Sequence, residues 1–165
     1  TADSVPGRGA VFTVELPAAP PARSSAPGPG VVPASALLPA LRRGHVLVVE
    51  DEEAVAIVMK DMLSELGQEA TVARDIVTAW DLLASDPGAW DVVTLDVRMP
   101  GGSGKDLYSR LMRDLSIVAK RVIFVTGDTA DTDTQRFLTM TGCPVLTKPV
   151  GFATLASVLV PLLGA

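Results

Sequence analysis

Charged and hydroxyl-bearing residues follow directly after several short apolar runs of this chain. They are Glu50 and Asp51 after residues 46–49, Asp96 after residues 91–95, Thr126 after residues 121–125, and Lys148 just beyond residues 144–146. Carboxylates, a hydroxyl and an amine are the groups that hold a cation and stabilise charge on a reacting anion. These residues are therefore the candidates for the chemistry of the chain.

The elements that must position them alternate in type. The apolar runs are rich in β-branched residues, and the stretches between them carry apolar residues at helical spacing, which predicts an open, doubly wound α/β fold around a five-stranded parallel sheet. In such sheets ligands bind beyond the carboxyl ends of the strands, so the candidate residues should meet at one edge. The expected strands are residues 46–49, 69–72, 91–95, 121–125 and 144–146.

Five helices are expected between and after these strands. Gly67 is placed to end the first, and Asp75 and Ser103 are placed to cap the second and third. Trp80 and Trp90 are expected in packing faces. The apolar stripes cover residues 55–66, 76–83, 107–115 and 152–162, and a less regular helix is expected near residues 130–140.

The gathered carboxylates need a cation. Two such charges ~4 Å apart repel by about 4 kcal/mol at an effective dielectric of about 20, and oxygen-only ligands favour Mg²⁺. A carboxylate beside Mg²⁺ can attack phosphorus and form an acyl phosphate if the phosphoryl oxygens are neutralised. Lys148 and Thr126 suit that task, and Gly127 leaves room for a donor group or a water.

Four segments resemble the signature segments of response-regulator receivers, in the family's order. They are VLVVEDEE, TLDVRMPGGSG, VIFVTGD and LTKP, within residues 45–165. The resemblance implies a flavodoxin-like (βα)₅ fold with strand order 2-1-3-4-5. It also implies two-component signalling in which a histidine kinase or a histidine phosphotransfer protein donates a phosphoryl group, followed by hydrolysis or onward transfer.

The resemblance further implies roles for individual residues. Asp96 would be phosphorylated, Lys148 would contact the phosphoryl group, and Thr126 would reorient towards it. The ligands of Mg²⁺ would be Asp51, Asp96 and the backbone carbonyl of Arg98, with Glu50 acting through a water. One position departs from the family pattern, because Val145 stands where receivers usually have an aromatic switch residue. We therefore expect the phosphoryl chemistry to survive and the surface change to differ.

The first 17 residues carry a second resemblance. TADSVPGRGAVFTVELP is similar to the closing hairpin and strand of histidine-kinase ATP-binding domains, and the alternation of Phe12, Val14 and Leu16 supports a strand. The implied parent is a hybrid sensor histidine kinase. Its organisation here would be a kinase remnant over residues 1–17, a linker over residues 18–44 and a receiver over residues 45–165. Seven of the 13 prolines lie in residues 17–44, although residues 34–43 could form a short docking helix.

The amino-acid composition of the chain disfavours some classes of binding partner. The formal net charge is −5 and no Lys/Arg cluster is present, which disfavours binding to nucleic acid or to an anionic membrane. Cys143 is the only cysteine, so it is expected as a small buried side chain, and His45 is expected to be structural. No leader or membrane-spanning run is evident, so we expect this segment in the cytoplasm, with a membrane-associated parent left open.

Two other functions remain open at this point. A haloacid-dehalogenase-like phosphatase also uses Asp, Thr, Lys and Mg²⁺, but it would need a second Asp where Arg98 stands. A receiver-shaped module that no longer accepts phosphate is the other. Residues 101–105 (GGSGK) lack the flanking residues of a P-loop and are interpreted as a flexible turn. Asp128, Asp131 and Asp133 lack the Gly and Glu of a calcium loop and are expected to cap a helix.

Overall fold

The computed structural model describes residues 2–5, 9–12, 41–99, 102–127 and 130–164. The chain divides into two units, Thr1–Pro33 and Ala34–Ala165. In the first unit, β1 (Ala2–Val5) and β2 (Gly9–Phe12) form an antiparallel hairpin in which Ala2 lies opposite Phe12. The expected strand through Leu16 and most of the expected linker lie outside the described residues.

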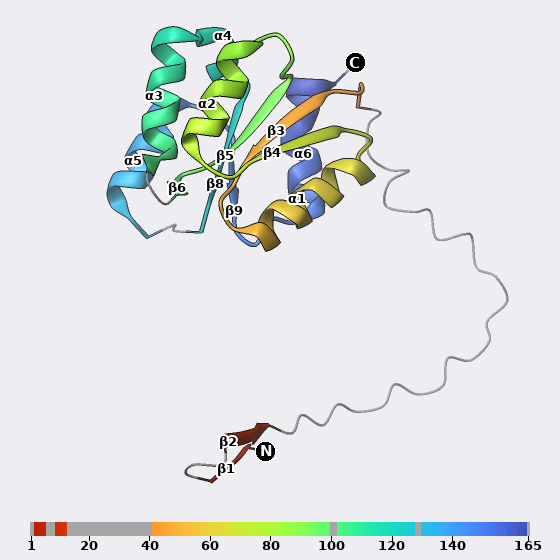
Figure 1. The fold of residues 1–165 in the computed structure, drawn as a ribbon, viewed down its shortest axis with the longest axis vertical. Helices are drawn as coiled ribbons and strands as arrows, with labels where there is room; N and C mark the ends of the chain where they lie inside the picture. Colours follow the sequence, from red (N-terminus) through yellow and green to blue (C-terminus); the bar gives the residue numbers. More distant parts are fainter. Residues whose placement is uncertain (1, 6–8, 13–40, 100–101, 128–129, 165) are drawn as a thin grey trace, which may run out of the picture. The chain divides into compact units, whose positions relative to one another are not determined.

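The second unit is built on a five-stranded parallel sheet (Figure 1). Its spatial order is β4-β3-β5-β8-β9, which is the order 2-1-3-4-5 along the chain, as predicted. All five strands fall within two residues of their expected positions. They are β3 (His45–Val49), β4 (Glu69–Ala73), β5 (Val92–Asp96), β8 (Val122–Thr126) and β9 (Val145–Thr147).

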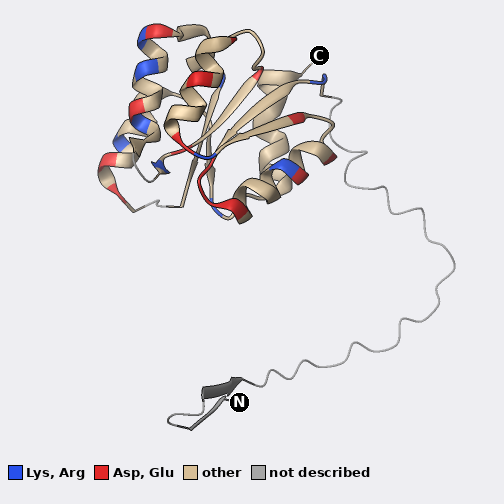
Figure 2. Cartoon of the chain, viewed as in Figure 1, with Lys and Arg blue, Asp and Glu red and all other residues tan. Residues whose placement is uncertain are grey.

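Helices cover both faces of the sheet (Figure 1). One face packs against α2 (Ile76–Ser85), α3 (Gly104–Asp114) and α5 (Thr132–Thr141). The other packs against α1 (Glu53–Glu65) and α6 (Phe152–Leu163). All residues of β5 and β8 are buried, as expected for inner strands covered on both sides. Figure 2 shows that α6 carries no charged residue along its length.

The helix ends follow the expected chemistry. The Asp75 carboxylate accepts a hydrogen bond from the Thr78 N–H at 2.8 Å, and the Ser103 hydroxyl accepts one from the Lys105 N–H at 3.1 Å. Gly67 has a φ of 76° just beyond α1, a value that favours glycine. Two features were not predicted, the short antiparallel pair β6 (Arg98–Met99) and β7 (Gly102–Ser103), and the single turn α4 (Ser116–Ala119).

Residues 41–44, which we expected in the linker, are bound to the folded unit. Leu41 forms an antiparallel bridge with Gly164, and the Gly44 N–H donates to the Gln68 side-chain oxygen at 2.8 Å. The helix considered for residues 34–43 is therefore wrong at residues 41–43, because these residues run without helical structure into β3. Its earlier part lies outside the described residues. In the part of the chain that is described, no helix combines the length and apolarity needed to cross a bilayer.

Asp91, directly before β5, binds the segment that leads into β3. Its carboxylate accepts hydrogen bonds from Arg42 Nη2 at 2.7 Å and from the His45 N–H at 2.9 Å. Partial burial opposes the charged form, but the hydrogen bonds and the positive charge of Arg42 prevail and lower the pKa of Asp91. A carboxylate with a lowered folded pKa stabilises the fold above its ordinary pKa, and this stabilisation is lost as the pH falls through the folded value.

We expect Asp91→Asn to lower the free energy of unfolding at pH 7 by about 1–2 kcal/mol, the usual worth of hydrogen bonds to a charged group. The difference from wild type should shrink as the pH falls below about 4. Urea unfolding at pH 7, 5 and 3.5 measures both effects. Asp133→Asn, at an exposed pair with Arg136, is the control and should change stability by less than about 0.5 kcal/mol. A difference that stays constant with pH would contradict the role of the Asp91 charge.

Candidate functional site

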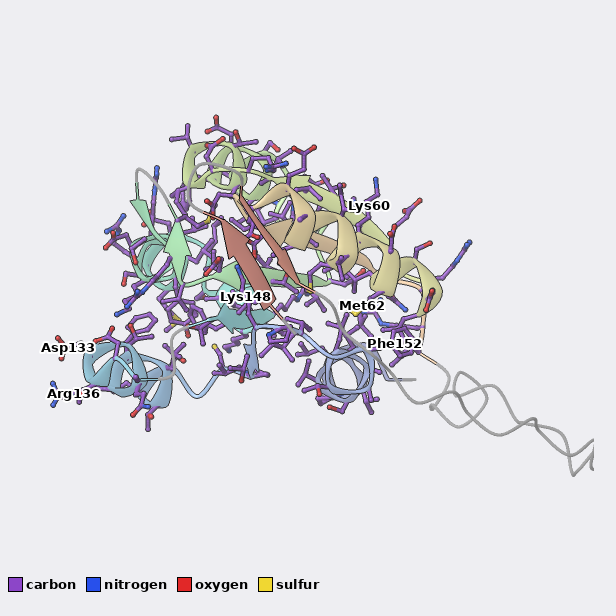
Figure 3. The ribbon with its side chains drawn as sticks, turned by 90° about the horizontal axis from the view of Figure 1, so that it is seen from below. Lys60, Met62, Asp133, Arg136, Lys148 and Phe152 are labelled. Atoms are coloured by element: carbon purple, nitrogen blue, oxygen red, sulfur yellow. The ribbon has the colours of Figure 1, made fainter. Side chains whose placement is uncertain are left out.

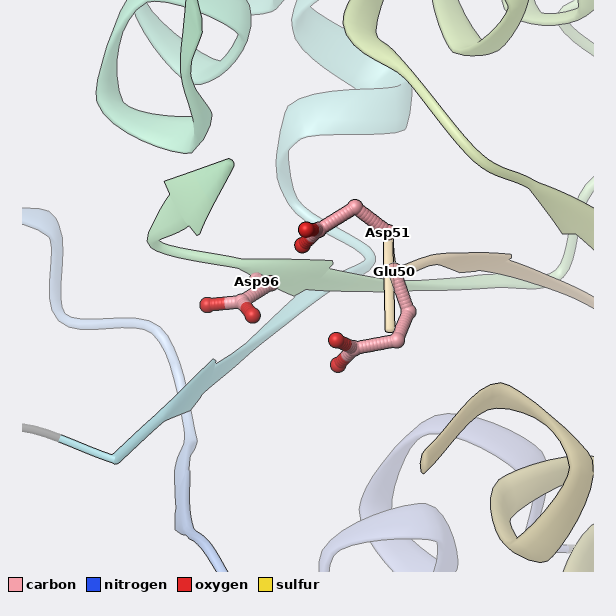
Figure 4. Close-up of side chains that lie close together, drawn as sticks. All are labelled: Glu50, Asp51 and Asp96. Atoms are coloured by element: carbon pink, nitrogen blue, oxygen red, sulfur yellow. The ribbon is translucent and has the colours of Figure 1, made fainter. Parts of the chain in front are cut away.

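The predicted acidic residues meet at the carboxyl edge of the sheet. Glu50 and Asp51 directly follow β3, and Asp96 ends β5. Figure 4 shows the Glu50 and Asp51 side chains extending toward Asp96, and one carboxylate oxygen from each of the three lies within 4.8 Å of the others. Because β3 and β5 are paired neighbours, the sheet itself brings the carboxylates together.

Lys148 joins two of these carboxylates. It follows β9, and Figure 3 shows it on the carboxyl edge, between α1 and α5. Its Nζ lies 2.6 Å from Asp96 Oδ2 and 2.8 Å from the Glu50 carboxylate. Glu50 and Asp96 are only 2% and 5% exposed, so their charges would repel strongly without a cation between them. Lys148 supplies that positive charge.

The pKa values of Glu50 and Lys148 shift according to the balance between burial and their mutual ion pairing. Burial raises the pKa of Glu50, the negative charge of Asp96 adds to the rise, and Lys148 opposes it. Burial acts to lower the pKa of Lys148, but its hydrogen bonds to Asp96 and Glu50 outweigh this and raise it. Lys148 is therefore held in its charged form, as the shared partner of two buried carboxylates.

Both oxygens of Asp96 are held in place. Oδ2 accepts the hydrogen bond from Lys148 at 2.6 Å, and Oδ1 accepts one from the Arg98 N–H at 2.9 Å. The chain at Gly104 also passes close to the Asp96 backbone, since a Cβ on Gly104 would lie 2.1 Å from the Asp96 carbonyl oxygen. The interpretation of residues 101–105 as a flexible turn was wrong for residues 102–105, because these residues form β7 and the start of α3. Gly104 lets the chain pass this close to Asp96.

Asp51 has a partner that the sequence did not indicate. Arg74 follows β4, and its Nη2 and Nε lie 2.6 Å and 3.2 Å from the Asp51 carbonyl oxygen. The contact depends on the register of the sheet, in which Ala73 lies opposite Val49. Asp51, two positions beyond Val49, is thereby brought beside Arg74, one position beyond Ala73.

Thr126 completes the predicted set. It ends β8, is 3% exposed, and its carbonyl accepts a hydrogen bond from the Lys148 N–H at 2.8 Å. A Cβ on Gly127 would lie 3.9 Å from the Lys148 Cβ, an ordinary contact. Val145, at the position of the usual aromatic switch, is 39% exposed in β9. The Arg98 guanidinium lies 3.9 Å from Asp131.

The remaining candidates have structural partners. His45 Nε2 lies 2.9 Å from the Thr71 hydroxyl, and its ring lies 4.5 Å from that of Trp90. Asp131 caps α5, as expected, whereas Asp128 lies outside the described residues. Cys143 is half-buried beside the Tyr108 hydroxyl. Burial, with the Cys143 thiol adding to it, raises the pKa of Tyr108 to about 12.

The donor set suits a hard divalent cation. Glu50, Asp51 and Asp96 offer only oxygen ligands from two neighbouring strand ends, and Mg²⁺ prefers one or two carboxylates together with waters and phosphate oxygens. Among the described residues, no other group of three acidic, His or Cys side chains meets the same condition. The fit therefore rests on the chemistry of these three side chains.

Known proteins resemble this chain in sequence. A sequence model of the response regulator receiver domain family matches residues 46–160. The sensory transduction protein RegX3 of Mycobacterium tuberculosis is 36% identical over 104 residues, which are 63% of this chain and 44% of RegX3. The aerobic respiration control sensor protein ArcB of Escherichia coli is 30% identical over 122 residues, which are 74% of this chain and 15% of ArcB.

Solved structures agree. A receiver domain protein from Clostridium thermocellum superposes with a TM-score of 0.65 at 26% identity, covering 72% of this chain and 93% of that one. The receiver domain of Francisella response regulator 1452 gives 0.62 at 26% identity, covering 72% and 95%. The chain spans less than half the length of curated relatives such as RegX3. With its fold, its acidic edge and these matches, the chain belongs to the response regulator receiver domain family of two-component signalling.

Proposed function

We propose that Asp96 is the phosphoacceptor of a Mg²⁺-dependent phosphoryl transfer. The observation that carries the proposal is the Asp96 carboxylate itself, which is buried, held between Lys148 and the Arg98 N–H, and close to Glu50 and Asp51. A carboxylate fixed in this way is oriented before the phosphoryl group arrives, and orientation and charge compensation supply most of the catalysis in phosphoryl transfer.

These contacts support the following transfer. An Asp96 carboxylate oxygen attacks phosphorus, the new O–P bond forms, and the bond from phosphorus to the donor breaks. When the donor is a phosphohistidine, its imidazole leaves with the bonding electron pair and takes up a proton. Lys148 leaves Asp96 Oδ2 and binds a phosphoryl oxygen, so the cation stays with the negative charge. Asp51, Asp96 and the Arg98 carbonyl would hold Mg²⁺, with Glu50 acting through a water. The bound cation would neutralise charge on the phosphoryl oxygens.

The signal would leave through the neighbouring surface. Thr126 is suited to reorient towards the phosphoryl group because it ends β8 beside Lys148. Val145 cannot make the usual coupled rotation of an aromatic ring, so the change would pass through backbone shifts of β9 and the helices beside it, α5 and α6. Phosphorylation would thus bias a two-state surface. Hydrolysis of the acyl phosphate, with water entering beside Gly127, would reset it.

The proposed parent is a cytoplasmic or membrane-associated hybrid sensor histidine kinase, with a histidine kinase or phosphotransfer protein as donor. Three features support it: the resemblance of residues 1–17 to the end of a kinase ATP-binding domain, the β1–β2 hairpin, and the match to a sensor protein, ArcB. The protein sequence preceding Thr1 tests this. A histidine phosphoacceptor helix and nucleotide-binding loops are expected there, and their absence would refute the parent.

Membership of the receiver family leaves the phosphatase alternative without support. A receiver-shaped module that does not accept phosphate remains the competing function, because Val145 departs from the usual switch pattern. The charged pocket favours the phosphoacceptor, since a binding module has no need for two buried carboxylates around one lysine.

Incubation with acetyl phosphate and Mg²⁺ should add the mass of one phosphoryl group to the protein. The gain should be absent in Asp96→Asn, which cannot form the acyl phosphate, and after removal of Mg²⁺ with EDTA. Intact-mass spectrometry measures it. No gain, either with acetyl phosphate or with a phosphorylated cognate histidine donor, would favour the module that does not accept phosphate.

Lys148→Gln should lower both stability and reactivity. Without the lysine, two buried carboxylates lose their shared cation, and we expect a loss of about 2–4 kcal/mol in the free energy of unfolding, discounted for the partial exposure of Lys148. Mg²⁺ should stabilise this variant more than wild type. The phosphorylation rate should fall by about 100-fold or more. Lys60→Gln, at an exposed lysine of α1 (Figure 3), is the matched control. Equal rates for the two variants would exclude Lys148 from the reaction.

A further inference from the structure

Arg74 makes a contact beside the acidic edge that the proposed phosphoryl transfer does not use. Its Nη2 and Nε both point to the Asp51 carbonyl oxygen, at 2.6 Å and 3.2 Å. Arg74 is exposed and lies on β4's outgoing loop, at the edge of the sheet. A guanidinium that donates twice to one backbone oxygen fixes the direction of that carbonyl better than a single donor would.

The carbonyl of Asp51 lies between two anchored stretches of backbone. On one side, the Glu50 N–H donates to the Ala73 carbonyl at 3.0 Å. On the other, α1 begins, with the Ala56 N–H donating to the Glu52 carbonyl at 3.0 Å. Rotation of the Asp51 peptide within this short stretch would redirect the Asp51 side chain. The Arg74 contact resists that rotation.

We propose that Arg74 is a positioning residue for the divalent-cation site, acting through the Asp51 backbone. The inference rests on the proposed function, because it assumes that Asp51 is a ligand of Mg²⁺. Arg74 itself touches neither the phosphoryl group nor the cation. It aims the Asp51 carboxylate at the position where Glu50 and Asp96 also converge (Figure 4).

The charge of Arg74 and its positioning contact predict opposite changes in Mg²⁺ affinity when Arg74 is replaced. Loss of a positive charge near the acidic cluster would by itself tighten binding of Mg²⁺, and loss of the positioning contact would weaken it. The guanidinium is exposed, so water and salt screen its charge. Outer-shell partners of metal ligands, by contrast, commonly change affinity by about 10- to 100-fold. Positioning should therefore prevail.

The test is Mg²⁺ binding by isothermal titration calorimetry to the whole chain, before any phosphodonor is added. We expect Arg74→Gln to raise the Kd by about 10-fold. Arg74→Lys keeps the charge but not the paired donors, so it should recover only part of the affinity. Arg113→Gln removes an exposed arginine that pairs with the adjacent Asp114, and it should leave the Kd unchanged.

A second readout separates positioning from general damage. With acetyl phosphate, Arg74→Gln should need about 10-fold more Mg²⁺ for half-maximal phosphorylation, yet reach the wild-type rate when Mg²⁺ is saturating. An unchanged or lower Kd in Arg74→Gln, with wild type binding normally, would overturn the role of Arg74 alone. Failure of wild type to bind Mg²⁺ would overturn the proposed metal site and the role of Arg74 with it.

Discussion

The site depends on one interaction, the contact of a single lysine with two buried carboxylates. Lys148 reaches Glu50 and Asp96 from β9, across the position of β8 in the sheet. Like charges buried so close together repel strongly, so the strand order that brings an amine to the acidic edge stabilises it. Lys148 thereby lowers the electrostatic cost of burying Glu50 and Asp96 side by side.

Much of this site could be predicted from the sequence, because each site residue lies within a few positions of a recognisable strand. Apolar runs marked the strands, and the polar residues directly after them marked the edge where they meet. What escaped prediction depends on pairing between distant segments. Arg74 reaches Asp51 only through the register of β3 and β4. Gly104 matters because the chain passes close to the Asp96 carbonyl, and no periodicity in the sequence encodes that approach.

Under the proposed function, the signal would leave the pocket without the usual aromatic switch. Val145 offers no aromatic ring to rotate. Tyr108 of α3, Phe124 of β8 and Phe137 of α5 form an edge-to-face cluster with ring centroids 5.1–5.9 Å apart. Phe124 lies in the same strand as Thr126, two residues away. Because protein interiors are closely packed, a shift at the end of β8 would, under the proposed function, be carried to α5 through these ring contacts.

The most direct test of the phosphoacceptor assignment is a crystal structure with Mg²⁺ and beryllofluoride, which mimics a phosphoryl group bound to a carboxylate. We expect beryllofluoride on an Asp96 oxygen, Lys148 Nζ moved from Asp96 to a fluoride, and the cation bound by Asp51, Asp96 and the Arg98 carbonyl. Beryllofluoride absent from Asp96 while Lys148 keeps its contacts with Glu50 and Asp96 would contradict the assignment.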